Sequence, residues 1–151
     1  MSRKANAIDA DEFSGSPETL TRKQVLEAIR KGQSLVDADM RGADLSAVNF
    51  DNADLKNAKL ADANLTGCSF RNANLFGASL WHANLRDAVL DGANLEEADF
   101  DFANLDGITL KGAKIKKAIF PLKRLSVDDI REAVRTGRRI HMEGTPLEDD
   151  E

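Results

Sequence analysis

The 151-residue sequence has one cysteine, no tyrosine, three prolines and no long hydrophobic run. A single cysteine forms no internal disulfide, which agrees with a reducing compartment, and we expect a cytoplasmic location. No apolar stretch approaches the roughly 18 residues that a membrane span needs, so no span is expected. No apolar stretch follows the basic residues near the N-terminus either, which argues against a secretory signal. The length is typical of one domain.

The charge is mildly acidic, with a formal net charge of −5 and a pI near 5.1. A protein that neutralises nucleic acid phosphates has a basic face, so we expect no direct contact with nucleic acid. The hydrophobic content of 42% is enough for a packed core and excludes wholesale disorder.

The middle of the chain repeats every five residues. Each fifth residue from Met40 to Phe120 is large and apolar, at all seventeen positions. The residue two places earlier is alanine at fourteen of these seventeen repeats, and Val48, Cys68 and Ile108 are the exceptions. The other three positions are mostly polar or glycine. A register this long is typical of a repeat protein.

A period of five fits neither regular secondary structure. An α-helix repeats its face every 3.6 residues and a strand every two, so neither would bury these positions. Short straight legs joined by corners do bury them, and the coils would stack at about 4.8 Å as strands do. Phe50 and Phe70 lie 20 residues apart, as do Phe100 and Phe120, which favours four legs per coil. The period predicts a β-solenoid.

Segments such as ADLKN, ANLTG, ANLFG and ANLRD follow the pattern A-(D/N)-L-x-x, and the sequence resembles the pentapeptide-repeat protein family. The resemblance covers about residues 34 to 122. It implies an all-β solenoid, a right-handed quadrilateral β-helix of about four to five coils. It implies no particular activity, because fold does not determine function.

A stack of coils needs a cap at each end. Short helices are predicted near 21–31 and 126–136, with Thr21 and Gln24 in a capping box and an apolar stripe of Val25, Leu26 and Ile29 on the first coil. The expected organisation is a flexible segment 1–19, a capping helix 20–32, the β-helix 33–122, a capping helix with a short extension 123–142, and a flexible acidic tail 143–151.

The second predicted helix repeats the first at an offset of 105 residues, with Leu, Glu, Ala, Arg and Gly in matching places. Two interpretations stay open. Good amphipathic caps converge on similar sequences, or the second copy once opened a further repeat domain.

The sequence contains few residues that could form a catalytic or metal-binding site. His82 and His141 lie in segments with no evident reason to meet, although Asp62 lies one coil before His82, and two such groups do not make a metal site. Cys68 replaces a small inward residue and is interpreted as a buried hydrophobe. The repeat asparagines at 64, 74, 84, 94 and 104 are expected to bond to backbone at the corners. We expect no catalytic residues, no cofactor and no metal.

The favoured function is a non-enzymatic, rigid protein–protein interaction module, such as a bacterial adaptor, assembly or effector component with an unknown partner and possible self-association. The alternative is an acidic DNA mimic that binds a type II topoisomerase such as DNA gyrase, as some members of the family do. Residues 38–120 hold 12 acidic and 9 basic side chains, which is a net charge of −3. Duplex DNA carries one charge per about 1.7 Å, so this segment is a poor mimic.

Three aromatic residues stand at outward positions that elsewhere are polar: Phe76, Trp81 and Phe102. A four-legged coil would bring them close together, and an exposed aromatic cluster usually marks a contact surface. They are the predicted interaction patch. The alternative is that the C-terminal segment covers the patch with Ile130, Val134 or Ile140.

Overall fold

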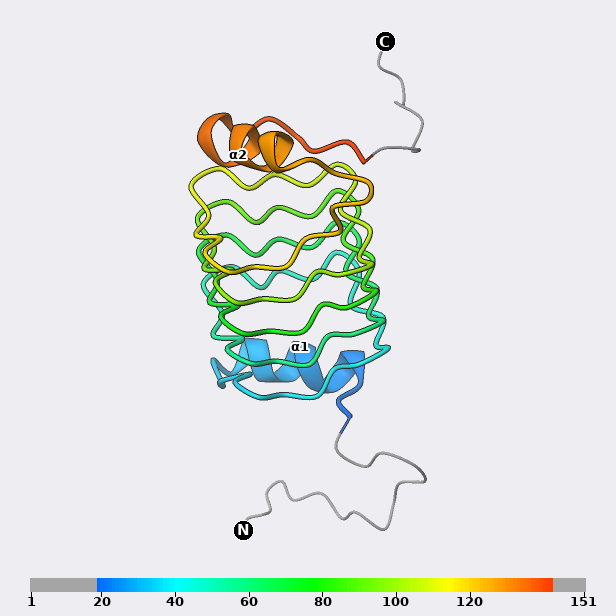
Figure 1. Ribbon diagram of the computed structural model, residues 1–151. Coiled ribbons are helices and arrows are strands. Elements are labelled where there is room, and N and C mark those ends of the chain that lie inside the picture. The colour runs from blue at the N-terminus through cyan, green and yellow to red at the C-terminus, as the bar shows by residue number, and fades with distance from the viewer. Residues whose placement is uncertain (1–18, 143–151) are drawn as a thin grey trace.

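A computed structural model gives the fold and describes residues 19–142. The chain winds in stacked coils between two helices, α1 (Arg22–Arg30) and α2 (Val127–Thr136), which lie at opposite ends of the stack (Figure 1). Of the predicted flexible segment 1–19, only Thr19 is described, and it forms a parallel bridge with Asp39. The other residues of that segment, and the predicted tail 143–151, lie outside the described residues.

Parallel bridges between residues 20 apart hold the coils together. One series runs from Asp39 through Lys59 and Ser79 to Asp99 and Ile119, and the other three legs have equivalent series. A spacing of 20 residues is four pentads per coil, which is the number that the phenylalanine spacing favoured. Each leg contributes a single bridge residue, so the described chain contains legs rather than extended strands. The right hand of the coil stays a prediction.

Each corner is a tight turn with one left-handed residue. The backbone N–H after the corner donates to the large residue before it, as Ala83 does to Leu80 at 3.0 Å. The second corner residue has a φ near +60°, which is the geometry of a type II turn and favours glycine or asparagine. At Gly107 a Cβ would lie 2.2 Å from Oδ1 of Asp87 on the preceding coil, so the Asp87 side chain would have to move to accommodate one.

The core is the column of large and small residues inside the coils. Every large repeat residue from Met40 to Leu110 is buried, and Phe50 stacks on Phe70 with ring centroids 5.0 Å apart. The expectation of uniform burial is wrong at the ends, where Ile115, Phe120 and the alanines at 38, 43, 53 and 118 are only partly buried. These legs lack a neighbouring coil on one side, so part of their surface stays accessible.

The residues directly after the large ones differ in their exposure. Asp106 and Pro121 are buried, most of the others are half-buried, and the rest, such as Arg41 and Trp81, are exposed. The C-terminal segment covers Asp106, whose Oδ1 accepts a hydrogen bond from the N–H of Met142 at 3.0 Å.

Helix α1 begins and ends where its sequence signals indicate. Thr21 is the N-cap, and it forms the predicted capping box with Gln24. Val25 and Ala28 are buried, whereas Leu26 is 42% exposed, so its place in the predicted apolar stripe is wrong. Residues 25, 28 and 29 share one helical face, and residue 26 is turned about 100° from Val25.

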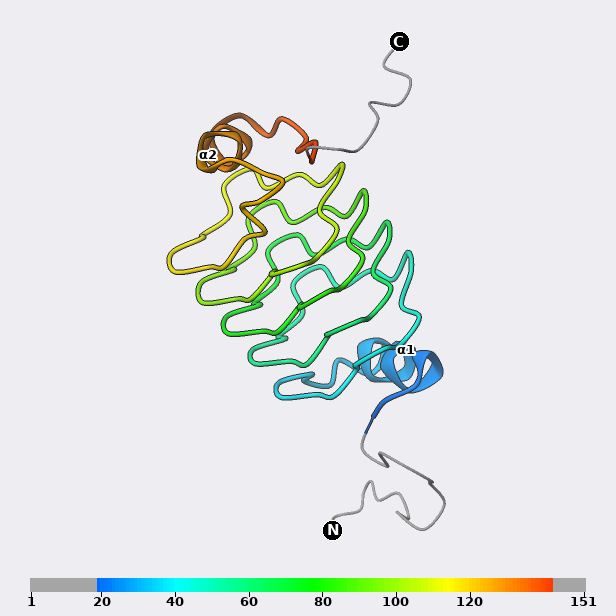
Figure 2. The ribbon, with the colours of Figure 1, turned by 45° about the vertical axis from the view of Figure 1, so that its right-hand side comes forward.

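Helix α2 and the segment after it lie across the last coil (Figure 2). Ser126 is the N-cap and Gly137, with φ 84°, ends the helix. Residues 138–142 then run beside the last coil, where the N–H of Ile140 donates to the carbonyl of Ile108 at 3.0 Å. Ile130 and Ile140 are therefore buried at the end of the stack. The alternative that this segment covers the aromatic patch is wrong for the described residues.

Candidate interaction surface

Two of the three predicted patch residues lie together on the outside of the coils. Trp81 follows the leg of Leu80, and Phe102 stands at the corresponding corner of the next coil. Their ring centroids are 5.8 Å apart with the planes at 70°, an edge contact that aromatic pairs favour. Trp81 is 42% exposed and Phe102 is 61% exposed.

Phe76 lies at the preceding corner and is half-buried. The Nζ atom of Lys56, one coil earlier, lies 5.7 Å from the centroid of its ring. Within residues 19–142, no ring contact joins Phe76 to Trp81 or Phe102. The structure thus brings Trp81 and Phe102 of the predicted patch into contact, whereas Phe76 makes no ring contact with either of them.

The structure adds two residues that the sequence-based patch omitted. Leu122 occupies the corner position 20 residues after Phe102 and is 56% exposed. Ile119 points outward from the last leg, at a repeat position where earlier coils have Lys59, Ser79 and Asp99. The 20-residue register was the signal that could have found both. Trp81, Phe102, Ile119 and Leu122 are called the apolar face below.

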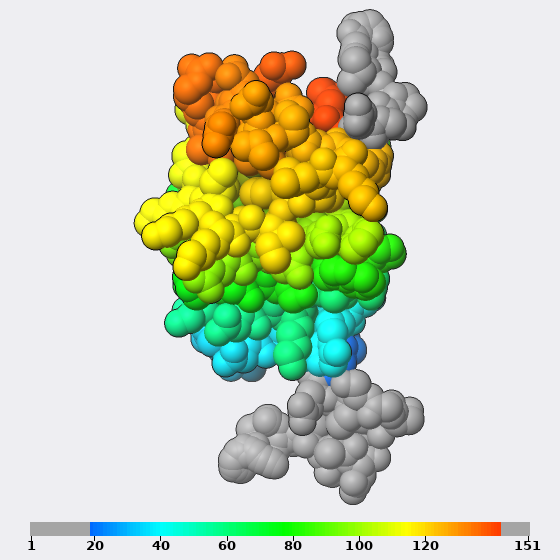
Figure 3. Space-filling view, viewed as in Figure 1, coloured from blue at the N-terminus to red at the C-terminus, as the bar shows by residue number. Residues whose placement is uncertain are grey.

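A groove of about 380 Å³ opens beside this apolar face. Its lining residues come from two consecutive coils and from the end of the C-terminal segment: Asp101, Phe102, Ala103, Pro121, Leu122, Lys123, Arg124 and Met142. Figure 3 shows the last coil, in yellow, below the orange α2 region. The groove has room for an apolar side chain of a partner.

Phe102 adopts a backbone conformation that its side chain disfavours. Its φ is 61°, in the left-handed region where glycine and asparagine are the low-energy choices. A bulky residue there costs on the order of 1–2 kcal/mol, and the exposed ring recovers little of that by burial. Ala47, Glu97 and Lys117 have the same φ at their corners, so this conformation belongs to the repeat, and what distinguishes Phe102 is its large exposed aromatic side chain.

His82 lies beside this pair. Its Nδ1 atom is 2.7 Å from Oδ1 of Asp62, the residue 20 places earlier, and its ring packs against Trp81 with centroids 5.3 Å apart. Both partners of the hydrogen bond are exposed. In the described part of the chain, no three His, Cys, Asp or Glu side chains gather as metal ligands do.

The repeat asparagines, each directly before a large inward residue, form the backbone hydrogen bonds that the sequence predicted. The Oδ1 atoms of Asn64, Asn74, Asn84, Asn94 and Asn104 each accept the backbone N–H two residues on, at 3.0–3.1 Å. These bonds satisfy corner donors and serve the fold.

Cys68 is buried in the core, as predicted, and its Sγ lies 2.9 Å from the carbonyl oxygen of Leu45. Burial raises the pKa of the Cys68 thiol to about 11. The neutral thiol is therefore the form that the folded protein favours.

We expect Cys68 to resist thiol reagents at pH 7.5 in the folded protein and to react once the chain is unfolded in denaturant, because the thiolate is the reactive form. The raised pKa also predicts a stability contribution that is complete below pH 9 and is lost as the pH rises towards 11. Time-resolved labelling with a chromogenic disulfide reagent checks the first point, and denaturant titrations at pH 8 and pH 10 check the second. Rapid labelling of the folded chain would contradict the burial.

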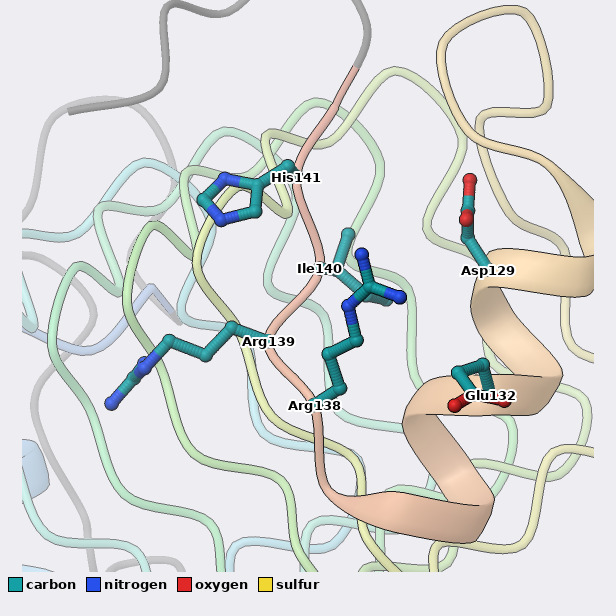
Figure 4. Close-up of a pocket in the computed structure, with 6 residues that line it drawn as sticks. All are labelled: Asp129, Glu132, Arg138, Arg139, Ile140 and His141. Atoms are coloured by element: carbon teal, nitrogen blue, oxygen red, sulfur yellow. The ribbon is translucent and has the colours of Figure 1, made fainter. Parts of the chain in front are cut away.

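A second, smaller hollow of about 60 Å³ lies between α2 and the segment after it. Asp129 and Glu132 line it from the helix (Figure 4). Figure 4 shows the Arg138 side chain on the side of the segment that faces the helix, and the side chains of Arg139 and His141 on the other side. Arg139 donates to the carbonyl of Gly107 at 2.6 Å, which ties the segment to the last coil. The hollow belongs to this structural junction.

Short legs, tight corners and a filled core together define a β-solenoid that presents outward side chains on regular ladders. Similarity to known proteins shows the family within this class. The chain matches the pentapeptide repeat region family over residues 35–120, and it belongs to that family. None of the helices within residues 19–142 has the length and apolar character to cross a membrane.

Two solved structures illustrate the relationship. A pentapeptide repeat protein from Nostoc PCC 7120 is 30% identical, with a TM-score of 0.64 over 78% of this chain and 96% of that one. A pentapeptide repeat protein from the thylakoid lumen of Arabidopsis thaliana is 36% identical, with a TM-score of 0.51 over 52% of this chain and 54% of that one. The match thus spans about half of the Arabidopsis protein. The curated proteins include no match to this sequence.

Proposed function

We propose that this protein is a non-enzymatic interaction module, which uses the apolar face and the adjoining groove to bind a protein partner. The contact between exposed Trp81 and Phe102 is the observation that carries the proposal. Tryptophan and other aromatic residues dominate the energetics of protein interfaces, and a rigid rod presents them without a large entropic cost.

The exposed ring of Phe102 supports the same role, because a corner needs no phenylalanine. Asn52, Asn57 and Asn72 hold the equivalent corner position with φ values of 58–64°. The acids of the coils are partly offset by bases, as in the Asp39–Arg41 ion pair at 2.6 Å, so the described residues lend no support to the DNA-mimic alternative. A cytoplasmic location stays a prediction, as one similar protein comes from the thylakoid lumen.

The test separates binding from folding. We expect Phe102→Asn to leave the stability unchanged or to raise it slightly, since asparagine tolerates the left-handed conformation, and we expect the variant to lose partner capture or self-association. Trp81→Ala should have the same effect on binding, with a loss on the order of tenfold or more for a central anchor. Quantitative affinity capture from the source cell and sedimentation of the purified chain measure it.

Glu97→Asn is the matched control, because Glu97 has the same corner conformation, with φ 60°, on a different leg. It should change stability in the same direction as Phe102→Asn and leave binding unchanged. If Phe102→Asn and Trp81→Ala capture the same proteins and sediment in the same way as the unchanged chain, the apolar face is not the binding surface.

A further inference from the structure

The last coil and the loop after it form a basic band. Between Asp106 and Asp128 the sequence has no acidic residue and six basic ones. All six side chains belong to exposed residues: Lys111, Lys114, Lys116, Lys117, Lys123 and Arg124. Within residues 19–142, none of the five lysines forms an ion pair. This end of the rod is positive although the whole chain is acidic.

The basic band adjoins the groove beside the apolar face. Of the six basic residues, Lys123 and Arg124 line the groove. They do so together with Asp101, Phe102, Ala103 and Leu122, so two cations, one carboxylate and apolar groups face the same space. A ligand that fits both would carry several negative charges and one large apolar side chain. The hollow shape favours the insertion of a single side chain over contact with a flat lipid surface.

A segment of this chain has that chemistry. Residues 143–151, with the sequence EGTPLEDDE, hold five acidic residues and one large apolar residue, Leu147. Met142, the residue directly before this segment, itself lines the groove. Leu147 is five residues further on, and five extended residues span at most about 17 Å, so the groove is within reach.

We propose that residues 143–151 dock on this surface as a built-in ligand, with Leu147 in the groove and the acidic residues against the lysines of the basic band. A tethered segment binds with an effective concentration in the mM range, so individually weak contacts suffice. An external partner would then need the same chemistry, an acidic segment with an apolar anchor, and would have to displace the tail. The inference goes beyond the interaction role proposed above and holds or fails independently of it.

Trp81 is the only tryptophan and lies against Phe102, so its fluorescence reports on the groove without a label. We expect Leu147→Ala in the full chain to raise acrylamide quenching of Trp81 and to shift the amide NMR signals of Phe102, Leu122 and Lys123. Neutralising three acids together (Glu148→Gln, Asp149→Asn, Asp150→Asn) should act in the same direction, as should 1 M salt, where the Debye length falls to about 3 Å.

Exchanging the charges of Lys123 and Asp149 is the most specific test of the proposed contact. Lys123→Glu should release the tail, and adding Asp149→Lys should restore the signals of the unchanged chain. Lys59→Glu is the matched control, because Lys59 is exposed and lies at a repeat position three coils before Ile119. It should leave quenching and amide signals near the groove as they were.

If Leu147→Ala and the neutralised variant leave Trp81 quenching and the groove amides unchanged, the tail does not dock there and the inference is wrong. If only the neutralised variant has an effect, the apolar anchor is refuted. Loss of partner capture in Phe102→Asn would stand in either case, which separates this inference from the proposed function.

Discussion

Leu85→Ala is expected to lower the free energy of unfolding by about 2–5 kcal/mol, which is a large share of the stability of a small domain. Leu85 is fully buried in the middle of the stack, and coils on both sides contact its leg. The rigid corners hinder collapse around a cavity, so we expect a value in the upper half of that range. Chemical denaturation followed by circular dichroism measures it.

Ala83, the small inward residue on the same leg, should tolerate a larger side chain equally poorly. Ala83 is 1% exposed, so Ala83→Leu places three extra carbon atoms in a filled tube and should cost about 1–3 kcal/mol. Lys59→Ala, at an exposed outward position, is the control and should change stability by less than about 0.5 kcal/mol. If both inward variants behave like Lys59→Ala, the interior is not close-packed and the solenoid description is wrong.

Val25→Asp and Leu26→Asp should have opposite outcomes although the residues are neighbours on α1. Val25 is fully buried against the first coil, whereas Leu26 faces solvent. An unpaired carboxylate at position 25 should detach α1, with a cost above about 3 kcal/mol, and at position 26 it should be almost neutral. Thermal unfolding of the two variants makes the comparison.

The capping role itself is tested by removing residues 1–32. Without α1, the first coil loses the N–H of Leu20 as donor to Asp39 and the guanidinium of Arg22 as donor to the carbonyls of Asp44 and Ser46. The free edge and exposed core should then drive association through the first coil. Sedimentation measures the size of the truncated chain. A monomer with unchanged stability would show that α1 is dispensable as a cap.

The inward and the outward positions of the repeat have different roles. Inward positions form the core of the rod, and in the proposed function outward positions bind the partner. Variants of Leu85 and Val25 should remove fold and binding together. Variants of Phe102 and Trp81 should remove binding alone, because corners and outward positions contribute little to the core.

Much of the fold was predictable because the interactions that make it are local or strictly periodic. The pentad register identified the buried residues from Met40 to Leu110, and the phenylalanine spacing favoured four legs per coil. The two helices were placed within a residue of their ends, because capping at Thr21 and Ser126 depends on residues three positions away. The side chains of the repeat asparagines accept hydrogen bonds from the backbone N–H two residues further along the chain, which the sequence also predicts.

Contacts between segments far apart in the sequence could be found only in the folded structure. Nothing local shows that Asp106 is covered by the chain at Met142, or that residues 138–142 lie on the end of the stack and leave Trp81 and Phe102 uncovered. The five-residue pattern is enough to specify the interior of this protein, since each inward residue packs against equivalent repeat positions in the adjacent coils. The functional outside depends on which residues 20 apart become neighbours and on where the terminal segments pack, and these are non-local contacts that a five-residue pattern does not encode.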